Sequence, residues 1–325
     1  MYLLIIFFIV IIFLLWFFQA SFKTKNPIYG VTFSQKFTEE LGLDWQKVFI
    51  ASLDELKVRN FRLPAYWNRI EPEDGDYNFT DLDWQINQAA KRDAKIILVV
   101  GQRVPRWPEC FISDWARDLD KAEREQKLLD YLKVLVNHYK ISANIIAWQV
   151  ENEPLLSLFG DCPTPDFDFL KKEVELVKSL DNRPIMITDS GELSLWLRTP
   201  KVADILGTSI YRSTYNHWWG YFYYPYPPAF YQLHAKLIKM LFPHLTKVII
   251  SEFQFEPWAR IDMVDLDIAE QYKSFNLKRF NKNLEFIKRS GFNEVYLWGV
   301  EWWYWLKEKK GIGDFWEKAK LIWKD

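Results

Sequence analysis

The chain has 325 residues, and its 42 Lys and Arg nearly balance its 43 Asp and Glu, giving a formal net charge of -1. Hydrophobic residues make up 49% and charged residues 26%, values that exclude a disordered chain, a collagen and a coiled coil. The balanced charge offers no basic surface, so we expect no nucleic-acid partner. Aromatic residues reach 18%, including 17 Trp, and this excess needs an explanation.

The chain begins with an uninterrupted apolar run, residues 1–18, that carries no charge. As a helix this run would span about 27 Å, close to the hydrocarbon thickness of a bilayer. It is either a cleaved signal peptide or a retained anchor. No Lys or Arg precedes it, and cleavage after Ala20 would place a bulky phenylalanine where a small residue is required. We therefore favour a transmembrane helix within residues 1–20, a linker over 21–27 and a folded domain over 28–325, with the lipid bilayer as a partner.

The orientation of this anchor is less clear from the sequence. Lys23 and Lys25 follow the apolar run, and the positive-inside rule alone would keep that end in the cytoplasm. A long folded domain can be translocated against so small a charge bias, so the orientation stays open at this point.

Beyond the linker, short apolar segments alternate with amphipathic ones. The eight segments expected to form strands are Ile28–Ser34, Val58–Pro64, Lys95–Gly101, Asn144–Val150, Pro184–Asp189, Ile205–Tyr211, Lys247–Ser251 and Glu294–Trp298. Residues 96–100 and 248–250 are apolar throughout, as parallel strands covered on both faces require. Helical periodicity lies between the strands, and one stripe over residues 272–287 is followed by Gly291, a suitable C-terminal cap.

Eight strands with intervening helices in about 300 residues predict a single (β/α)8 TIM barrel. A doubly wound open sheet is the alternative, but the chain has neither the GxGxxG nor the GxxxxGK phosphate loop that would favour it. A barrel places active-site residues at the carboxyl ends of its strands.

Two carboxyl groups are expected at that rim. The fourth strand runs into WQVENEP, which contains Glu153, and the seventh into SEFQ, which contains Glu252. Strands four and seven face each other across a closed barrel. Two opposed carboxyl groups are the machinery of glycoside hydrolysis, where one protonates the leaving oxygen and the other attacks or activates water. A single Glu at a strand end more often pairs with a nearby cation, but two at the same rim favour catalysis.

Asn152-Glu153-Pro154 after an apolar strand, together with Glu252, resembles clan A of the glycoside hydrolases and the cellulase-like family 5 within it. The resemblance covers nearly the whole chain after the leader and implies a retaining (β/α)8 glycosidase. It also implies that Glu153 is the acid/base, that Glu252 is the nucleophile and that Asn152 contacts the sugar 2-hydroxyl. This chemistry requires no metal or cofactor, and we expect none.

Other residues match the same pattern. Arg62, at the end of strand two, resembles the arginine that keeps the nucleophile ionised, and Tyr211, at the end of strand six, resembles the tyrosine that donates to it. A guanidinium stabilises an ionised carboxylate, whereas burial without such a partner keeps a carboxyl group protonated. Trp298, at the end of strand eight, resembles the platform under the reactive sugar. Further substrate-binding candidates in loops at this rim are Trp67, Gln102, Trp107, His217, Glu301 and Trp302.

The sequence also departs from the family pattern. Cellulase-like members usually carry a His near the end of strand three and another two residues before the strand-six Tyr. Here strand three leads into GQRVPRW, and Ser209 stands two residues before Tyr211. The chain is therefore a divergent relative of family 5 or a member of another family of the clan.

Cys110 and Cys162 are too far apart for a CxxC motif, and from spacing alone they are two unrelated thiols. The barrel places them in the neighbouring loops after strands three and four, where a disulfide is possible. We expect that bridge, which implies an oxidising compartment and outweighs the two lysines of the linker.

Together these features predict a monomeric, membrane-anchored glycosidase with an extracytoplasmic catalytic domain, or a secreted one if the leader is cleaved. Its expected substrates are β-linked glycans, whose apolar ring faces would stack on the loop tryptophans and tyrosines. A transglycosylase using the same pair and a non-catalytic glycan-binding barrel are the alternatives. The sequence leaves the sugar, the linkage and endo or exo cleavage open.

Overall fold

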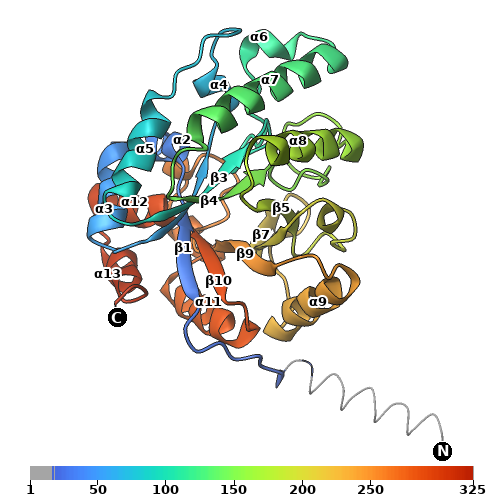
Figure 1. Ribbon diagram of the computed structural model, residues 1–325. Helices are drawn as coiled ribbons and strands as arrows, with labels where there is room; N and C mark the ends of the chain where they lie inside the picture. Colours follow the sequence, from blue (N-terminus) through green and yellow to red (C-terminus); the bar gives the residue numbers. More distant parts are fainter. Residues whose placement is uncertain (1–16, 18, 325) are drawn as a thin grey trace, which may run out of the picture.

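The computed structural model describes residues 17 and 19–324, and within them eight parallel strands close into a barrel surrounded by helices (Figure 1). The order around the barrel is β1-β10-β9-β6-β5-β4-β3-β2. Its strands are β1 (Ile28–Thr32), β2 (Asn60–Pro64), β3 (Lys95–Val100), β4 (Ile145–Val150), β5 (Ile185–Ser190), β6 (Ile205–Ile210), β9 (Lys247–Gln254) and β10 (Glu294–Trp298). The predicted (β/α)8 barrel is confirmed, and β9 and β10 are its seventh and eighth strands.

Both faces of these strands are covered, which explains their apolar sequences. In β3 every residue after Lys95 is buried. Side chains from several strands, including Ile97, Met186 and Tyr296, fill the barrel interior as a packed cluster. The barrel is therefore a solid scaffold whose loops carry the variable chemistry.

Helices, some of them capped by a polar side chain, surround the barrel as an outer layer. They are α2 (Gln35–Glu40), α3 (Trp45–Asp54), α4 (Trp67–Ile70), α5 (Thr80–Ala90), α6 (Asp114–Arg117), α7 (Lys121–Tyr139), α8 (Phe167–Leu180), α9 (Pro228–Leu241), α10 (Ile268–Ser274), α11 (Leu277–Ser290), α12 (Val300–Lys310) and α13 (Asp314–Lys320). Asp44, Asp120 and Asp166 each accept hydrogen bonds from backbone N–H groups of the first turn that follows.

The stripe over residues 272–287 does not form one helix. The structure divides it between α10 and α11, because Phe275 and Asn276 are extended and the Asn276 side chain caps α11 by accepting from the Arg279 N–H. Periodicity alone carries no information about such a break. Gly291 ends α11 in the left-handed conformation, as predicted.

The aromatic stretch after β6 forms a hairpin of β7 (Ser213–Asn216) and β8 (Gly220–Tyr223). Trp218 at its tip is 85% exposed. This hairpin is an addition to the barrel at the end where the strands finish.

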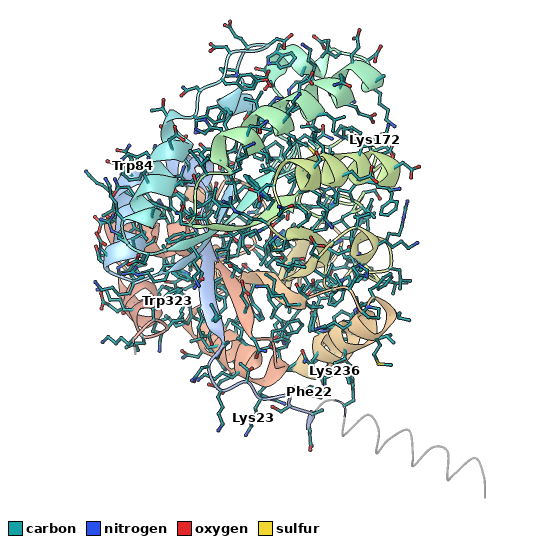
Figure 2. All side chains as sticks on the ribbon, viewed as in Figure 1. Phe22, Lys23, Trp84, Lys172, Lys236 and Trp323 are labelled. Atoms are coloured by element: carbon teal, nitrogen blue, oxygen red, sulfur yellow. A yellow bond between two sulfur atoms is a disulfide. The ribbon has the colours of Figure 1, made fainter. Side chains whose placement is uncertain are left out.

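No helix in the part of the chain that the structure describes is long and apolar enough to cross a membrane. The transmembrane segment predicted within residues 1–20 lies almost entirely outside the described residues. The linker that follows packs on the barrel: Phe22 N–H donates to the Arg289 carbonyl (2.9 Å), and Lys236 lies over the Phe22 ring (Figure 2). The chain therefore enters the barrel where the strands begin, at the rim opposite Glu153 and Glu252.

Candidate active site

The two carboxyl groups predicted to be catalytic come from opposite sides of the barrel. Glu153 is the third residue after the end of β4, and Glu252 lies within β9, which runs three residues beyond its predicted end. The register of β6 against β9 skips Ser251, and this irregularity aligns Glu252 with Ser209. Such bulges re-aim side chains next to functional sites. Glu153 is 8% and Glu252 4% exposed, so both open narrowly to solvent.

Glu252 is surrounded by donors. Arg62 Nη1 donates to its Oε1 at 2.7 Å, and the Tyr211 hydroxyl donates to its Oε2 at 2.8 Å. Arg62 has no exposed surface, and it also donates to Gln149 (2.6 Å) and Asn152 (2.7 Å). A buried guanidinium fixed in this way stabilises the ionised form of the carboxylate beside it.

Glu153 has a different environment. Its Oε1 accepts a hydrogen bond from the Ser209 hydroxyl at 2.6 Å, and no cationic side chain in the described chain lies within ion-pair distance of it. Burial, followed by repulsion from Glu252, raises the pKa of Glu153 to about 7. The carboxyl group therefore holds a proton up to neutral pH, as a general acid requires.

The backbone that presents Glu153 is strained. Glu151 and Glu153 both adopt left-handed φ angles, of 59° and 46°, which L-residues with a side chain disfavour. The Glu151 carboxylate offsets this strain by accepting from the N–H groups of Gln102 (2.8 Å) and Arg103 (2.6 Å), and so joins the loops after β3 and β4.

Asn152 connects the two sides of the site. Its Oδ1 accepts from Arg62 and from Thr188 (3.1 Å), and its Nδ2 donates to Glu109 Oε2 at 3.1 Å. The predicted residues Arg62, Asn152, Glu153, Tyr211 and Glu252 thus form one connected group, joined by residues that the sequence did not single out.

Trp298 lies beside this group. Its ring centroid is 6.2 Å from that of Tyr211, and its Nε1 donates to Glu256 at 2.8 Å. The Arg106 guanidinium lies 4.2 Å from the Trp298 centroid and forms ion pairs with Glu256 and Glu301. Glu301 is therefore a buried partner of Arg106, the residue that packs on Trp298.

Three sequence expectations are corrected by burial. Trp67, Glu301 and Trp302 have no exposed surface, so they offer none to a sugar. Trp67 donates to Glu71 and stacks on Tyr131. Trp302 points into the helical layer, where it donates to a buried glutamine and packs on a phenylalanine of α13. Apolar sequence near a catalytic loop does not distinguish packing from binding.

The other candidates are accessible. Trp107 is 62% exposed and contacts Phe159 edge-on at 5.7 Å. Gln102 is partly buried, and its Oε1 has no hydrogen-bond partner among the described residues. His217 is exposed on the turn of the β7–β8 hairpin, next to Trp218.

A disulfide ties two of these loops together. Cys110 and Cys162 are bonded, with an S–S distance of 2.05 Å. A cavity of about 350 Å³ adjoins the bridge, and its lining includes Gln102, Glu151 and Glu173. It lies between the catalytic loops and the helical layer.

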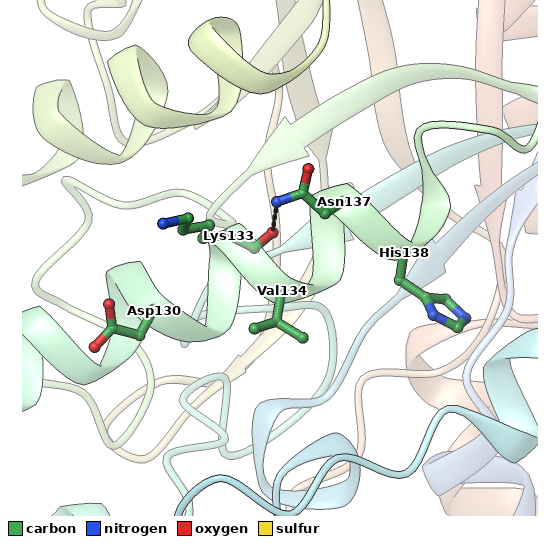
Figure 3. A pocket seen from close by; sticks show the side chains of 5 residues that line it. All are labelled: Asp130, Lys133, Val134, Asn137 and His138. Carbon is green, nitrogen blue, oxygen red and sulfur yellow. Dashed lines mark hydrogen bonds between the residues drawn. The ribbon is translucent and has the colours of Figure 1, made fainter.

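A larger surface depression, of about 500 Å³, is lined by residues of α7 alone (Figure 3). It is formed by Asp130, Lys133, Val134, Asn137 and His138, and none of the predicted site residues lines it. Within the described residues no group of three or more His, Cys, Asp or Glu is placed to hold a metal ion.

Comparison with known proteins assigns the family. The model of the cellulase family, glycosyl hydrolase family 5, matches residues 25–190, which is just over half of the chain. The chain belongs to glycosyl hydrolase family 5. This is a family of glycosyl hydrolases, and the match decides between the two alternatives that the sequence left open: the chain is a member of family 5 that departs from the usual pattern by lacking the two histidines. No curated protein matches it in sequence.

Solved structures share the barrel at low identity. Xylanase 10B from Thermotoga petrophila RKU-1 is 16% identical, with a TM-score of 0.55 over 84% of this chain and 82% of that one. An endo-beta-1,4-xylanase from Gloeophyllum trabeum is 14% identical, with a TM-score of 0.53 over 86% of each chain. An exo-beta-1,4-mannosidase from Opitutaceae bacterium strain TAV5 is 13% identical, with a TM-score of 0.55 over 86% of this chain and 54% of that one. The chain spans about half the length of several such structures, and these likenesses establish the fold alone.

Proposed function

We propose that this family 5 enzyme is a retaining glycosidase of β-linked oligo- or polysaccharides, with Glu252 as nucleophile and Glu153 as acid/base. The observation that carries the proposal is the contrast between two neighbouring carboxyl groups. One accepts hydrogen bonds from Arg62 and Tyr211, and the other has only a serine hydroxyl. Environments that separate the protonation states of paired carboxyl groups define an acid and a nucleophile.

The reaction proceeds in two displacements. Glu252 attacks the anomeric carbon while the glycosidic C–O bond breaks, and Glu153 gives its proton to the departing oxygen. Ionised Glu153 then removes a proton from water, whose oxygen attacks the same carbon and releases Glu252. The enzyme returns to its first protonation state, with one water consumed for each bond cleaved.

A row of aromatic side chains supports a glycan substrate. Trp298, Tyr211, Trp258, Phe159 and Trp107 follow one another with successive ring centroids 5.5 to 6.2 Å apart. The row begins at the nucleophile and ends at the exposed ring of Trp107. Sugar rings stack their C–H faces on such surfaces, so a substrate of several sugar units fits better than a single sugar.

Two variants test the mechanism. Glu252→Gln removes the nucleophile and should abolish cleavage of aryl β-glycosides. Glu153→Gln should slow glycosides with poor leaving groups by about 100-fold or more, but leave the first step nearly intact for a dinitrophenyl leaving group that needs no proton. Glu175→Gln, at an exposed position of α8, is the matched control. Full activity of Glu252→Gln, or a product of inverted anomeric configuration, contradicts the proposal.

Transglycosylation uses the same two residues, and product analysis distinguishes it. With excess sugar acceptor a hydrolase still releases mainly free sugar, whereas a transglycosylase forms longer products. Absence of turnover on every glycan tested, with binding retained, would instead indicate a glycan-binding barrel.

We also propose that the barrel is anchored by the apolar run within residues 1–20 and faces an extracytoplasmic space. The Cys110–Cys162 bridge supports an oxidising compartment. The entry of the chain at the rim opposite Glu252 supports an anchor that leaves the active site free. Fractionation and protease digestion of intact cells test this: a membrane-bound, protease-accessible barrel is expected, and a protected one contradicts it.

A further inference from the structure

A third carboxyl group, that of Glu109, lies in the catalytic centre. It belongs to the loop after β3 and has a left-handed φ of 75°. Its backbone is fixed at both ends: its N–H donates to the Arg106 carbonyl (2.7 Å), and its carbonyl accepts from the Val104 N–H (2.8 Å). The next residue, Cys110, is held by the disulfide.

The facing loop packs tightly against this position. A Cβ on Gly160 would lie 2.9 Å from the Glu109 Cβ, so that position accepts only glycine without displacement. The left-handed backbone, the disulfide and the close approach of the facing loop all fix the position of the Glu109 side chain. Such constraints are typical of side chains in functional sites.

The carboxyl group is only half satisfied. Glu109 is 6% exposed, and its Oε2 accepts from Asn152 Nδ2 at 3.1 Å. Its Oε1 has no hydrogen-bond donor among the described residues. Burial first, and then the nearby charge of Glu252, raise the pKa of Glu109 to about 8. Arg103 acts against this shift, and Glu153 adds to it.

An ion pair with Arg103 does not account for Glu109. Arg103 Nε is 3.8 Å from Glu109 Oε2, beyond hydrogen-bond distance. The two other nitrogens of Arg103 donate to the carbonyls of Leu156 (2.6 Å) and Phe159 (2.8 Å). Arg103 therefore hydrogen-bonds to the loop after β4 while its charge still faces Glu109 Oε2, and Oε1 of Glu109 stays free beside the catalytic pair.

We propose that Glu109 binds a ring hydroxyl of the sugar at the catalytic pair, next to the hydroxyl bound by Asn152. This inference rests on the proposed function. Asn152 has its oxygen committed to Arg62 and Thr188, so it offers the sugar its remaining amide hydrogen. Glu109 Oε1, beside it, is the hydroxyl of a carboxyl group that stays protonated below about pH 8, and such a hydroxyl both donates and accepts a hydrogen bond. These two groups side by side fit two neighbouring free hydroxyls of a pyranose, and they disfavour a sugar that is esterified or sulfated there.

Monodeoxy substrates test this assignment. The probes are the 4-nitrophenyl β-glucoside, mannoside or galactoside that the wild-type chain cleaves fastest, and its monodeoxy analogues. Loss of the bound hydroxyl should lower kcat/KM of the wild type by about 10- to 100-fold, the range for a hydrogen bond to a charged or strongly polar group. In Glu109→Ala the parent should fall by a similar factor, and the discrimination at that ring position should disappear.

Two further variants separate binding from positioning. Asn152→Ala should lose discrimination at the neighbouring ring position instead. Glu109→Gln keeps the shape of the side chain, so it should fold and show a smaller loss at the same position as Glu109→Ala. If Glu109→Ala slows the parent and every analogue by one common factor, or changes nothing, the inference is wrong. A different result, retained activity in Glu252→Gln, would contradict the proposed mechanism itself.

Discussion

A substitution at Ser209 changes the environment of Glu153, the proposed acid, and leaves the contacts of Glu252, the proposed nucleophile, in place. Its hydroxyl donates to Glu153 at 2.6 Å, and that bond lowers the pKa of Glu153 against the stronger effects of burial and of Glu252. Removing the bond therefore leaves a weaker acid.

The general acid must be protonated, so kcat/KM should decline as pH rises through about 7, the pKa of Glu153. In Ser209→Ala this alkaline limb should move to higher pH, because the ionised carboxylate loses a donor. The pH profiles of the two proteins with one aryl glycoside check the prediction. Arg103, Asp189 and Glu252 also act on the pKa of Glu153 and remain in both proteins. An unchanged limb would show that another group limits the rate.

Among individual residues, the sequence predicted those that belong to a short motif or stand near the end of a strand. Asn152 and Glu153 are adjacent in the chain, and Arg62, Tyr211 and Glu252 each occupy a strand end, so the barrel alone brings them together. Glu109 lies in an irregular loop and meets Asn152 only through the bridge and the turn of that loop, which no periodicity encodes. The neighbouring residue, Cys110, was the one sequence feature that could have indicated the position of Glu109, through its expected bridge to Cys162.

Among the elements, the loops after β3 and β4 behave as a unit. The disulfide closes a segment of 52 residues, for which a chain-entropy model gives about 4 kcal/mol of stabilisation. Replacing both cysteines by serine should lower Tm. It should also lower kcat/KM beyond the loss of stability, because Glu109 adjoins Cys110 and Glu153 lies in the loop that carries Cys162. Thermal unfolding and kinetics well below Tm check the two effects separately. Wild-type kinetics in the double variant would mean that the bridge contributes to stability alone and does not position the site residues.

The same loops present the outer end of the aromatic row. Trp107→Ala should raise KM for long oligosaccharides by roughly 3- to 10-fold, the value of one aromatic contact, and leave short aryl glycosides unchanged. Trp218→Ala is the matched control, since Trp218 is also largely exposed (85%, against 62% for Trp107) but lies on the β7–β8 hairpin, outside the row. Equal effects of both variants, or an effect on short substrates, would contradict a binding row.

The sequence predicted the strands correctly where both faces are buried. It did not predict element boundaries that depend on a single capping residue or on strand pairing. The strands of the barrel were found because covered parallel strands are rich in apolar residues, as in β3, where every residue after Lys95 is apolar. The boundary between α10 and α11 depends on the side chain of Asn276, and the extension of β9 past Ser251 depends on its pairing with β6 and β10. The first is a local cap and the second is a tertiary contact, and hydrophobic periodicity encodes neither.

For the molecule as a whole, the buried acids make stability depend on pH. Burial raises the pKa values of Glu109 and Glu192 to about 8 and those of Glu151, Glu153 and Glu301 to about 7. In the unfolded chain these groups titrate near 4.5. Between these values the folded chain binds more protons than the unfolded one, so the free energy of unfolding falls as pH rises.

The enzyme should therefore melt at a lower temperature at pH 8.5 than at pH 6. The surface acids with lowered pKa, such as Asp54 and Asp166, titrate below this window and add no slope, and the lowered pKa of His234 opposes the trend only near pH 6. Glu192→Gln should flatten the dependence, because the amide stays neutral and its oxygen can still accept from Tyr231, which donates to Glu192 at 2.6 Å. Thermal unfolding of both proteins across this range decides the matter. A Tm that is constant or rises with pH would mean that these carboxyl groups ionise inside the fold without cost.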